Sequence, residues 1–311
     1  MKRITQNEAL KILDGPIALK PVAEDVSIVI PTLGRPILES CLRWIADGSV
    51  WPGALIVVDQ GQNERVAAWL RHLQAIGLPT QYVPSRQHGR SAGINRGLEQ
   101  VQTRFVAITD DDCFVAADWL EKMTSRLRCE PDVILTGRVD LAGNDEADFS
   151  TVTSRQPKVY TRPQLKVHPF IGGNVGLTMA LVQKIGLFDE HPCLASAEDS
   201  DYGYRALRLG IPIAYDPDVA LYHYHWRDAN QRAARYADYA RSQGGFYGTH
   251  LRHGDWLILM QMIRALVRSP LRWLRGVVTG DKELAENGRA HTLHLLPGII
   301  TGLRRRKQCH A

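Results

Sequence analysis

The chain has 311 residues, of which 44% are hydrophobic and 23% charged, and its formal net charge is +5. This composition excludes a largely disordered chain, and the length allows one large or two modest domains. The five cysteines are scattered, odd in number and without a C-x-x-C pair. They argue against a disulfide framework and a structural zinc site, and they favour a reducing compartment.

The two ends of the chain differ in charge. Residues 1–225 carry 23 Lys/Arg and 27 Asp/Glu, whereas residues 226–311 carry 15 and 6, which gives net charges of −4 and +9. The basic part predicts a surface for an anionic partner, with lipid headgroups or nucleic acid as candidates. No apolar segment of a signal peptide or of a spanning helix stands out, so we expect a cytoplasmic protein that need not be freely soluble.

Apolar strands and helices alternate through the first half of the chain. Residues 1–25 have little periodicity and predict a short arm. The predicted strands lie at 26–30, 54–58, 80–83 and 105–108, and the predicted helices at 37–45, 64–73, 91–100 and 119–127. Continuous apolar strands separated by helices predict a parallel sheet that is covered on both faces.

Three consecutive carboxylates, Asp110, Asp111 and Asp112, follow the fourth predicted strand, and Asp59 ends the second one. Open α/β sheets bind ligands at the C-terminal ends of their strands. Carboxylate oxygens suit Mg²⁺ or Mn²⁺, which commonly bridge to substrate phosphates. The pattern therefore predicts a metal-nucleotide site. The alternatives are a solvated acidic turn and, for Asp59, a turn-forming role before Gly61.

Two glycines follow a long polar segment. Residues 132–139 predict a strand, and residues 140–166 predict an irregular loop or an insertion over a site. Gly172 and Gly173 then precede Asn174 inside a strand-like stretch. Adjacent glycines at such a place either allow close backbone approach to a ligand or mark a bulge.

A helix is predicted over residues 202–210, and Glu198 and Asp199 stand just before it. Acidic residues at a helix N-terminus are favoured by capping and by the helix dipole. A carboxylate at such a position can also act as a general base toward a hydroxyl nucleophile. The residues alone leave both interpretations open.

After a predicted turn at 216–218, residues 219–226 alternate as a strand does. His223 and His225 would then point to the same face. The pair could supply a metal ligand or could be half-buried polar residues.

These motifs, in this order, resemble the family 2 glycosyltransferases with a GT-A fold. The matching segments are VSIVIPT at 26–32, IVVDQG at 56–61, ITDDD at 108–112, GGN at 172–174, GLFDE at 186–190, and Glu198-Asp199 with Arg205 and Gly210. The resemblance implies an α/β, GT-A (Rossmann-like) fold, with a mostly parallel sheet flanked by helices and a C-terminal helical extension. It runs from about residue 26 to 226. The expected domains are an arm at 1–25, a catalytic domain at 26–226 and an extension at 227–311.

The resemblance also implies a nucleotide-diphospho-sugar donor and a divalent cation, Mg²⁺ or Mn²⁺. Pro31, Thr32 and Asp59 would lie near the base and ribose of the donor. Asp110 would contact the ribose or the metal, and Asp112 the metal that holds the diphosphate.

The other donor-site residues implied by the resemblance are Asn95, Asp111, Gly172, Gly173 and Asn174, although Asp111 could do no more than shape the turn. His223 matches a further metal or phosphate contact of the family, and His225 is close enough to leave that assignment open. Asp199 matches the base that deprotonates the acceptor, with Glu198 beside it.

The basic C-terminal part has a pattern of its own. Gln261, Arg264, Arg268, Arg272 and Arg275 recur every three or four residues and predict the basic stripe of an interfacial helix. Ser269-Pro270 predicts two short helices in place of one, and Gly244-Gly245 is expected to end the helix before them. An apolar stretch at 293–303 ends in the basic cluster 304–307. This part would bind an anionic membrane surface, or else pack on the catalytic domain or a second subunit.

The predicted function is inverting, metal-dependent transfer of a sugar to a hydroxyl of a cell-envelope glycan or lipid-linked acceptor. It would take place in the cytoplasm at the inner face of the cell membrane, without a nucleic-acid partner. One alternative is a sugar-nucleotide synthesising nucleotidyltransferase. Another is a non-enzymatic module that binds membranes or nucleic acid, although the basic part has no recognisable nucleic-acid-binding motif.

Overall fold

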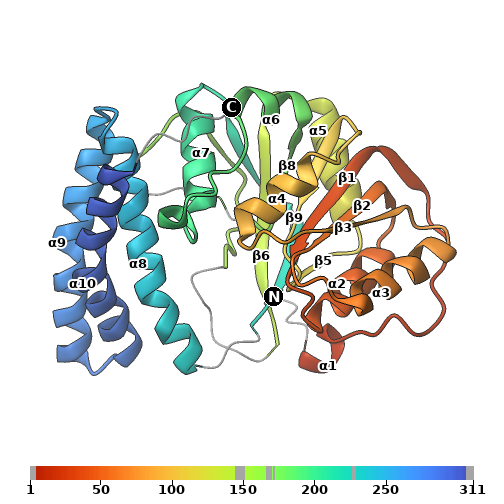
Figure 1. Cartoon of the computed structure of the whole chain (residues 1–311), viewed down its shortest axis with the longest axis horizontal. Helices are drawn as coiled ribbons and strands as arrows, with labels where there is room; N and C mark the ends of the chain where they lie inside the picture. The colour runs from red at the N-terminus through yellow and green to blue at the C-terminus, as the bar shows by residue number, and fades with distance from the viewer. Residues whose placement is uncertain (1–4, 144–150, 166–169, 171, 226–228, 306–311) are drawn as a thin grey trace. The chain divides into compact units, whose positions relative to one another are not determined.

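The computed structural model describes residues 5–143, 151–165, 170, 172–225 and 229–305 (Figure 1). The chain divides into two compact units. The first comprises Met1–Arg162, Pro169–Phe188 and Arg205–His225, and the second comprises Pro163–His168, Asp189–Tyr204 and Trp226–Ala311. Helix α7 (Glu198–Arg208) therefore begins in the second unit and ends in the first.

Within the described residues, the first unit contains a nine-stranded mixed sheet of order β3-β2-β1-β4-β8-β6-β9-β5, with β7 paired to β9. The strands are β1 (Val22–Thr32), β2 (Trp51–Asp59), β3 (Thr80–Pro84), β4 (Phe105–Ile108), β5 (Cys113–Val115), β6 (Ile134–Ala142), β7 (Lys158–Tyr160), β8 (Val175–Thr178) and β9 (Ile213–Tyr224). Neighbours from β3 through β4 are parallel, as are β6 and β9, and the remaining pairs are antiparallel. The predicted α/β class with a GT-A-like sheet is confirmed.

Helices connect and cover these strands. They are α1 (Gln6–Ala9), α2 (Ile37–Ala46), α3 (Glu64–Ala75), α4 (Arg90–Leu98), α5 (Trp119–Cys129) and α6 (Met179–Ile185). The four helices predicted before residue 130 are confirmed with ends that differ by no more than two residues, because each has a clear apolar face. In α2, for example, Leu38, Cys41, Leu42 and Ile45 are buried.

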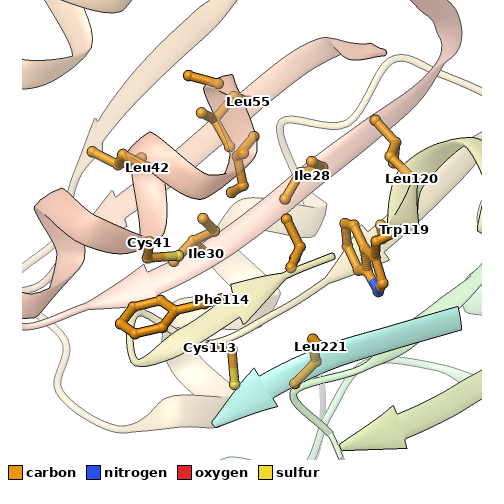
Figure 2. Packing of buried hydrophobic residues seen from close by; sticks show 14 of the residues in the cluster. Ile28, Ile30, Cys41, Leu42, Leu55, Cys113, Phe114, Trp119, Leu120 and Leu221 are labelled. Carbon is orange, nitrogen blue, oxygen red and sulfur yellow. The ribbon is translucent and has the colours of Figure 1, made fainter. Parts of the chain in front are cut away.

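The core of the first unit joins the sheet to α2 and α5 (Figure 2). Ile28 and Leu55 come from parallel neighbours β1 and β2, and Trp119 from the start of α5. Phe114 of β5 is fully buried, and its ring stacks on that of Trp44 with a centroid separation of 6.1 Å. This short strand, which directly follows the three carboxylates, is thus fixed by the core.

Several boundaries in the first unit differ from the predictions. Strand β1 begins at Val22, inside the expected arm, and β7 forms inside the expected irregular loop. The predicted turn at 216–218 is a bulge within the continuous strand β9, where the register passes from Asp216 to Ala220 opposite two consecutive residues of β6. In each case pairing with a strand distant in sequence supplies the hydrogen bonds, which local propensity does not reveal.

The second unit is built around α8 (Ala229–Leu251), α9 (Trp256–Thr279) and α10 (Lys282–Arg304), which run alongside one another (Figure 1). A short 3₁₀ helix, Pro192–Leu194, packs against this C-terminal helical extension. Within the described part of the chain, no helix is both long enough and apolar enough to cross a membrane.

Two expectations about these helices are wrong. Helix α9 continues through Pro270, which is exposed, and Ser269 Oγ donates to the carbonyl of Ala265 at 2.8 Å in the same turn. Gly244 and Gly245 lie inside α8. Residues Leu295 and Gly298 of α10 and Cys193 approach them so closely that a Cβ at either glycine would clash. Tertiary packing therefore overrides the low helix propensity of these residues.

Phe114→Ala should strongly destabilise the first unit. Truncating a fully buried Phe removes its transfer free energy and leaves a cavity beside Trp44, which together cost about 3–5 kcal/mol. Urea unfolding followed by Trp fluorescence would measure the loss. Leu19→Ala is the control, since Leu19 is 77% exposed and should change stability by less than about 0.5 kcal/mol. Equal unfolding midpoints for Phe114→Ala and the control would contradict this account of the core.

Candidate active site

The carboxyl ends of β1, β2 and β4 meet at one edge of the sheet, because these strands are parallel neighbours. Thr32 pairs with Asp59 across β1 and β2, and Val29 pairs with Ile108 across β1 and β4. The carboxylate turn, residues 110–112, directly follows Ile108 and so lies at this same edge. Sequence elements nearly 80 residues apart thus supply the residues of one site.

Asp111 connects the carboxylate turn to the end of β1 and to the loop that follows it. Its side chain is buried, and it accepts a hydrogen bond from Thr32 Oγ1 at 2.7 Å. Arg35 approaches the same carboxylate with two nitrogens, with Nε 3.2 Å from Oδ2 and the terminal nitrogen on Oδ1. Such bidentate pairing fixes both distance and orientation. Asp111 therefore does more than shape its own turn.

The charge of Asp111 depends on these partners. Burial raises the pKa of Asp111 to about 6, and the Asp112 carboxylate acts in the same direction. Arg35 and Thr32 oppose this effect. Arg35 also reaches Asp112, with a separation of 3.4 Å between the terminal nitrogen and Oδ2. One guanidinium thus compensates two neighbouring carboxylates.

Asp110 forms a separate ion pair with Arg90, the first residue of α4, at 2.7 Å from Nε to Oδ1. The two glycines before β8 border this pair. A Cβ on Gly172 would lie 2.6 Å from Arg90, and a Cβ on Gly173 would lie 2.7 Å from Asp110. The glycines therefore allow the backbone to come close to the side chains of this ion pair. Close approach to a ligand stays a prediction.

Asp112, Cys113 and His223 form a candidate metal site, since one ligand atom from each lies within 4.8 Å of the others. His223 Nε2 is 3.4 Å from Asp112 Oδ1. This separation is close to the roughly 3 Å between adjacent ligands of an octahedral ion with bonds of about 2.1 Å. The antiparallel register of β5 and β9, which places Cys113 opposite His223, produces the arrangement.

Cys113 is a neighbour of the metal site that sequence reasoning missed. Burial raises the pKa of its thiol well above the ordinary value, and the carboxylates of Asp110 and Asp112 act in the same direction. A neutral thiol is a weak ligand for hard cations, so Asp112 and His223 are the stronger ligands of this group. A signal was present in the sequence, because Cys113 directly follows Asp112, but the pairing of its strand with that of His223 was not visible.

Of the four predicted metal ligands, Asp112, Asp110, His223 and His225, two belong to this group. They are Asp112 and His223. His225 Nε2 is 3.4 Å from His223 Nδ1, so the two rings share one face, as strand alternation predicted. Asp110 is paired with Arg90. The donor set of Asp112 and His223 fits a divalent cation, and the parts played by Asp110 and His225 stay predictions.

Asp59 shapes the turn at the end of β2. It is fully buried, and its carboxylate accepts hydrogen bonds from the backbone N–H of Gly61 at 2.9 Å and of Asn63 at 2.6 Å. The hydroxyl of Tyr82 donates to it as well, at 3.1 Å. Pro31 lies beside this turn in β1. The turn-forming interpretation thus describes its contacts, and contact with the donor base stays a prediction.

Two predicted donor-site amides hold the protein backbone. Asn95 makes two hydrogen bonds with the backbone of Phe188, at 2.8 and 2.9 Å. Asn174 accepts from Trp119 Nε1 at 2.9 Å and donates to carbonyls of β6 and β9 at 3.1 and 3.0 Å. These contacts support a positioning role for both side chains, and direct contact with the donor stays a prediction.

Glu198 and Asp199 begin α7 in the second unit. Glu198 is buried, and Asp199 Oδ1 accepts from the backbone N–H of Ser200 at 2.6 Å. The local environment is therefore that of an acidic helix N-terminus. The role of this pair as general base stays a prediction.

The residues that sequence reasoning missed are Arg35, Arg90 and Cys113. Arg35 lies in the loop after β1, next to Gly34, and Arg90 begins α4 directly after Gly89, in the connection that follows β3. A positive residue in such a loop faces the edge where anionic ligands bind, which was the available signal.

The mixed sheet and the carboxylates at its parallel edge define a GT-A-type glycosyltransferase. The chain belongs to glycosyl transferase family 2, whose family model matches residues 27–186. The predicted family and the prediction of an enzyme are confirmed, and the non-enzymatic alternative is thereby excluded.

Two curated relatives support this placement. The chain is similar to chondroitin synthase from Escherichia coli, with 25% identity over 240 residues that cover 65% of this chain and 35% of that protein. It is also similar to hyaluronan synthase from Pasteurella multocida, with 25% identity over 247 residues that cover 67% of this chain and 25% of that protein. The chain thus spans about a third or less of the length of these relatives.

Among solved structures, the mannosyltransferase PcManGT from Pyrobaculum calidifontis, in complex with GDP-Man and Mn²⁺, has a similar fold. The match has a TM-score of 0.58 and covers 94% of this chain and 91% of that one. The sequences are 15% identical, so the likeness concerns the fold.

Arg35→Gln should destabilise the protein more than Arg35→Gln combined with Asp111→Asn. The single change leaves a buried carboxylate without its main counter-charge, which costs about 1–3 kcal/mol, whereas the double change removes the charge as well. The double-mutant cycle compares the wild type, Arg35→Gln, Asp111→Asn and the double variant. The free energy of unfolding of each would be measured in the presence of EDTA. Strictly additive effects would show that the pair contributes no coupling.

Proposed function

We propose that this protein is an inverting, metal-dependent glycosyltransferase that moves a sugar from a nucleotide-diphospho-sugar donor to a hydroxyl of a glycan or lipid-linked acceptor in the cell envelope. The observation that carries the proposal is the pairing of Asp112 with His223, 3.4 Å apart, next to the carboxyl ends of β1 and β2. Membership of family 2 supports the reaction class, and the polysaccharide synthases among the relatives support a glycan product.

In this proposal the edge of the sheet holds the donor. Pro31, Thr32 and Asp59 would flank the base and ribose, and Gly172 and Gly173, which border Arg90 and Asp110, would lie beside the donor. The neighbour that carries GDP-Man and Mn²⁺ is consistent with this class of donor and cofactor.

Asp112 and His223 would hold the cation, with Asp110 and His225 as further candidates. A bound Mg²⁺ or Mn²⁺ would offset the negative charge that develops on the leaving nucleoside diphosphate. Arg35 and Arg90 add two fixed positive groups next to the same carboxylates. These guanidinium groups would orient the donor phosphates once the carboxylates bind the cation.

Asp199 would take the proton from the acceptor hydroxyl, with Glu198 beside it. Transfer by direct displacement needs one such base and no covalent intermediate, and it inverts the anomeric configuration. A positioned base contributes typically about 10²- to 10⁴-fold to such a step.

We further place this transfer at the inner face of the cell membrane. The support is electrostatic, since residues 226–311 carry a net charge of +9 in a chain whose remaining residues sum to −4. Each basic residue near an anionic leaflet contributes about 1 kcal/mol of attraction.

Asp112→Asn should abolish metal-dependent donor turnover, with a loss of at least about 100-fold, because it removes a ligand and its charge. A panel of UDP-, GDP- and dTDP-sugars with Mn²⁺, Mg²⁺ or EDTA would identify the donor and the ion. The matched control is Asp118→Asn, which changes a half-exposed carboxylate that pairs with Lys122 of α5. Turnover that survives both EDTA and Asp112→Asn would rule out the metal assignment.

Asp199→Asn should lower kcat for transfer by about 10²-fold or more while the donor Kd stays unchanged, because the base acts on the acceptor. Single-turnover rates and donor titration would separate the two quantities, and NMR of the product would report inversion. Glu286→Gln, an exposed change in α10, is the control. Wild-type kcat in Asp199→Asn, or a retained anomeric configuration, would refute the proposed mechanism.

A further inference from the structure

The outward face of α9 is apolar along its whole length. Residues spaced three or four apart form one stripe and are all exposed, which is the reverse of the usual arrangement in a soluble helical unit. The apolar stripe consists of Trp256, Met260, Ile263, Val267, Leu271, Leu274 and Val278. Exposed fractions run from 42% at Met260 to 77% at Val278, so a large part of each of these residues is open to solvent.

The helices of the second unit contact one another partly through small residues. A Cβ on Gly276 of α9 would lie 2.4 Å from the backbone of Ala285 in α10, and a Cβ on Gly288 would lie 2.4 Å from that of Trp273. Glycines spaced four apart likewise join α8 to α10, at 244 and 248 on one helix and at 298 and 302 on the other. These glycines let the three helices approach closely, while large apolar residues such as Phe246, Ile258 and Leu295 form the core of the unit. The apolar stripe of α9 lies outside that core.

Basic residues follow one edge of the apolar stripe. Arg264, Arg268 and Arg275 lie there, the last two exposed and the first partly so, and α9 contains no acidic residue. The other two members of the predicted basic stripe face the protein. Arg272 donates to Asn287 at 2.7 Å, and the buried Gln261 donates to the carbonyl of Gln164 at 2.6 Å.

A second, shorter apolar stripe lies on α10. Its members are Leu293, Leu296, Ile300 and Leu303, each exposed by 40% or more, and Arg304 follows them. Two neighbouring helices therefore present apolar surface flanked by positive charge.

We infer that the apolar stripe of α9, with its arginine edge, is a membrane-docking surface that inserts among the acyl chains of an anionic lipid surface. The inference rests on the proposed membrane location and is independent of the proposed chemistry. Apolar side chains would enter the boundary of the acyl region while the three arginines meet the headgroups. Trp256, at the N-terminal end of the stripe, suits the interface between the two.

The charge pattern favours lipid over a second copy of the chain. A two-fold symmetric contact would bring the same face of both copies together. Helix α9 would then oppose its own arginines with no acidic residue to compensate them. Anionic headgroups supply that compensation.

Flotation of the full-length protein with vesicles of phosphatidylcholine and phosphatidylglycerol tests the inference. We expect the wild type to float with 3:1 mixed vesicles and only weakly with phosphatidylcholine alone. Arg264, Arg268 and Arg275 changed together to Gln should weaken partitioning on the order of 100-fold, since each contributes roughly fivefold. Val267→Glu with Leu274→Glu should abolish flotation, because the carboxylates would enter the acyl region.

The control is Leu19→Glu, which places one glutamate on an exposed apolar residue of the first unit. It should float as the wild type does. Circular dichroism of each variant checks that the helices form. The inference fails if the wild type does not float, or if the glutamate pair floats equally well. It also fails if the wild type is a dimer that the glutamate pair dissociates without any vesicle binding, which would assign the face to a second copy.

Donor turnover without vesicles separates this inference from the proposed function. The glutamate pair should retain wild-type hydrolysis of the donor while losing flotation. Flotation without any turnover of a nucleotide sugar would support the docking surface and refute the proposed chemistry.

Discussion

The ion pair between the buried carboxylate of Asp111 and Arg35 is the interaction on which the candidate site depends. Strands β1 and β4 are parallel neighbours, but parallel pairing ends before the residues that matter, in the loop after Thr32 and the turn after Ile108. Asp111 joins these two segments through Thr32 and Arg35. The sheet brings the segments to one edge, and this contact sets their separation.

The same contact is part of a charge balance. Three consecutive carboxylates repel one another, and the folded site offsets them with Arg35 and Arg90, which come from different segments. A cation that binds Asp112 would compete with Arg35 for that carboxylate and would free positive charge for a phosphate ligand. The site is therefore suited to bind a cation and an anion together, as a metal-bound nucleoside diphosphate requires.

The sequence predicted the parallel half of the fold well, because α2 and α3 have strong apolar periodicity and β1, β2 and β4 are continuous apolar runs. It did not predict β7 or the bulge in β9, which exist through pairing between distant strands. Within the site, the motifs identified Asp112 and His223, but not the guanidinium groups of Arg35 and Arg90. The motifs located the carboxylates. The positions of their counter-charges depend on the three-dimensional course of the loops, which the motifs do not describe. The motifs also assigned Asn95 and Asn174 to the donor site. Each amide holds the backbone of the protein, and direct contact with the donor stays a prediction.

In the basic C-terminal helices, the predicted pattern and the structure agree only in part. Their periodicity predicted an interfacial helix, yet Arg272 and Gln261 of the predicted stripe face the protein. Glycines bring α8, α9 and α10 close together, and large apolar residues such as Phe246, Ile258 and Leu295 fill the core of the unit. The apolar stripe of α9 lies outside this core. An acyl-chain boundary rimmed by anionic headgroups is a surface that satisfies both this stripe and the adjacent arginines.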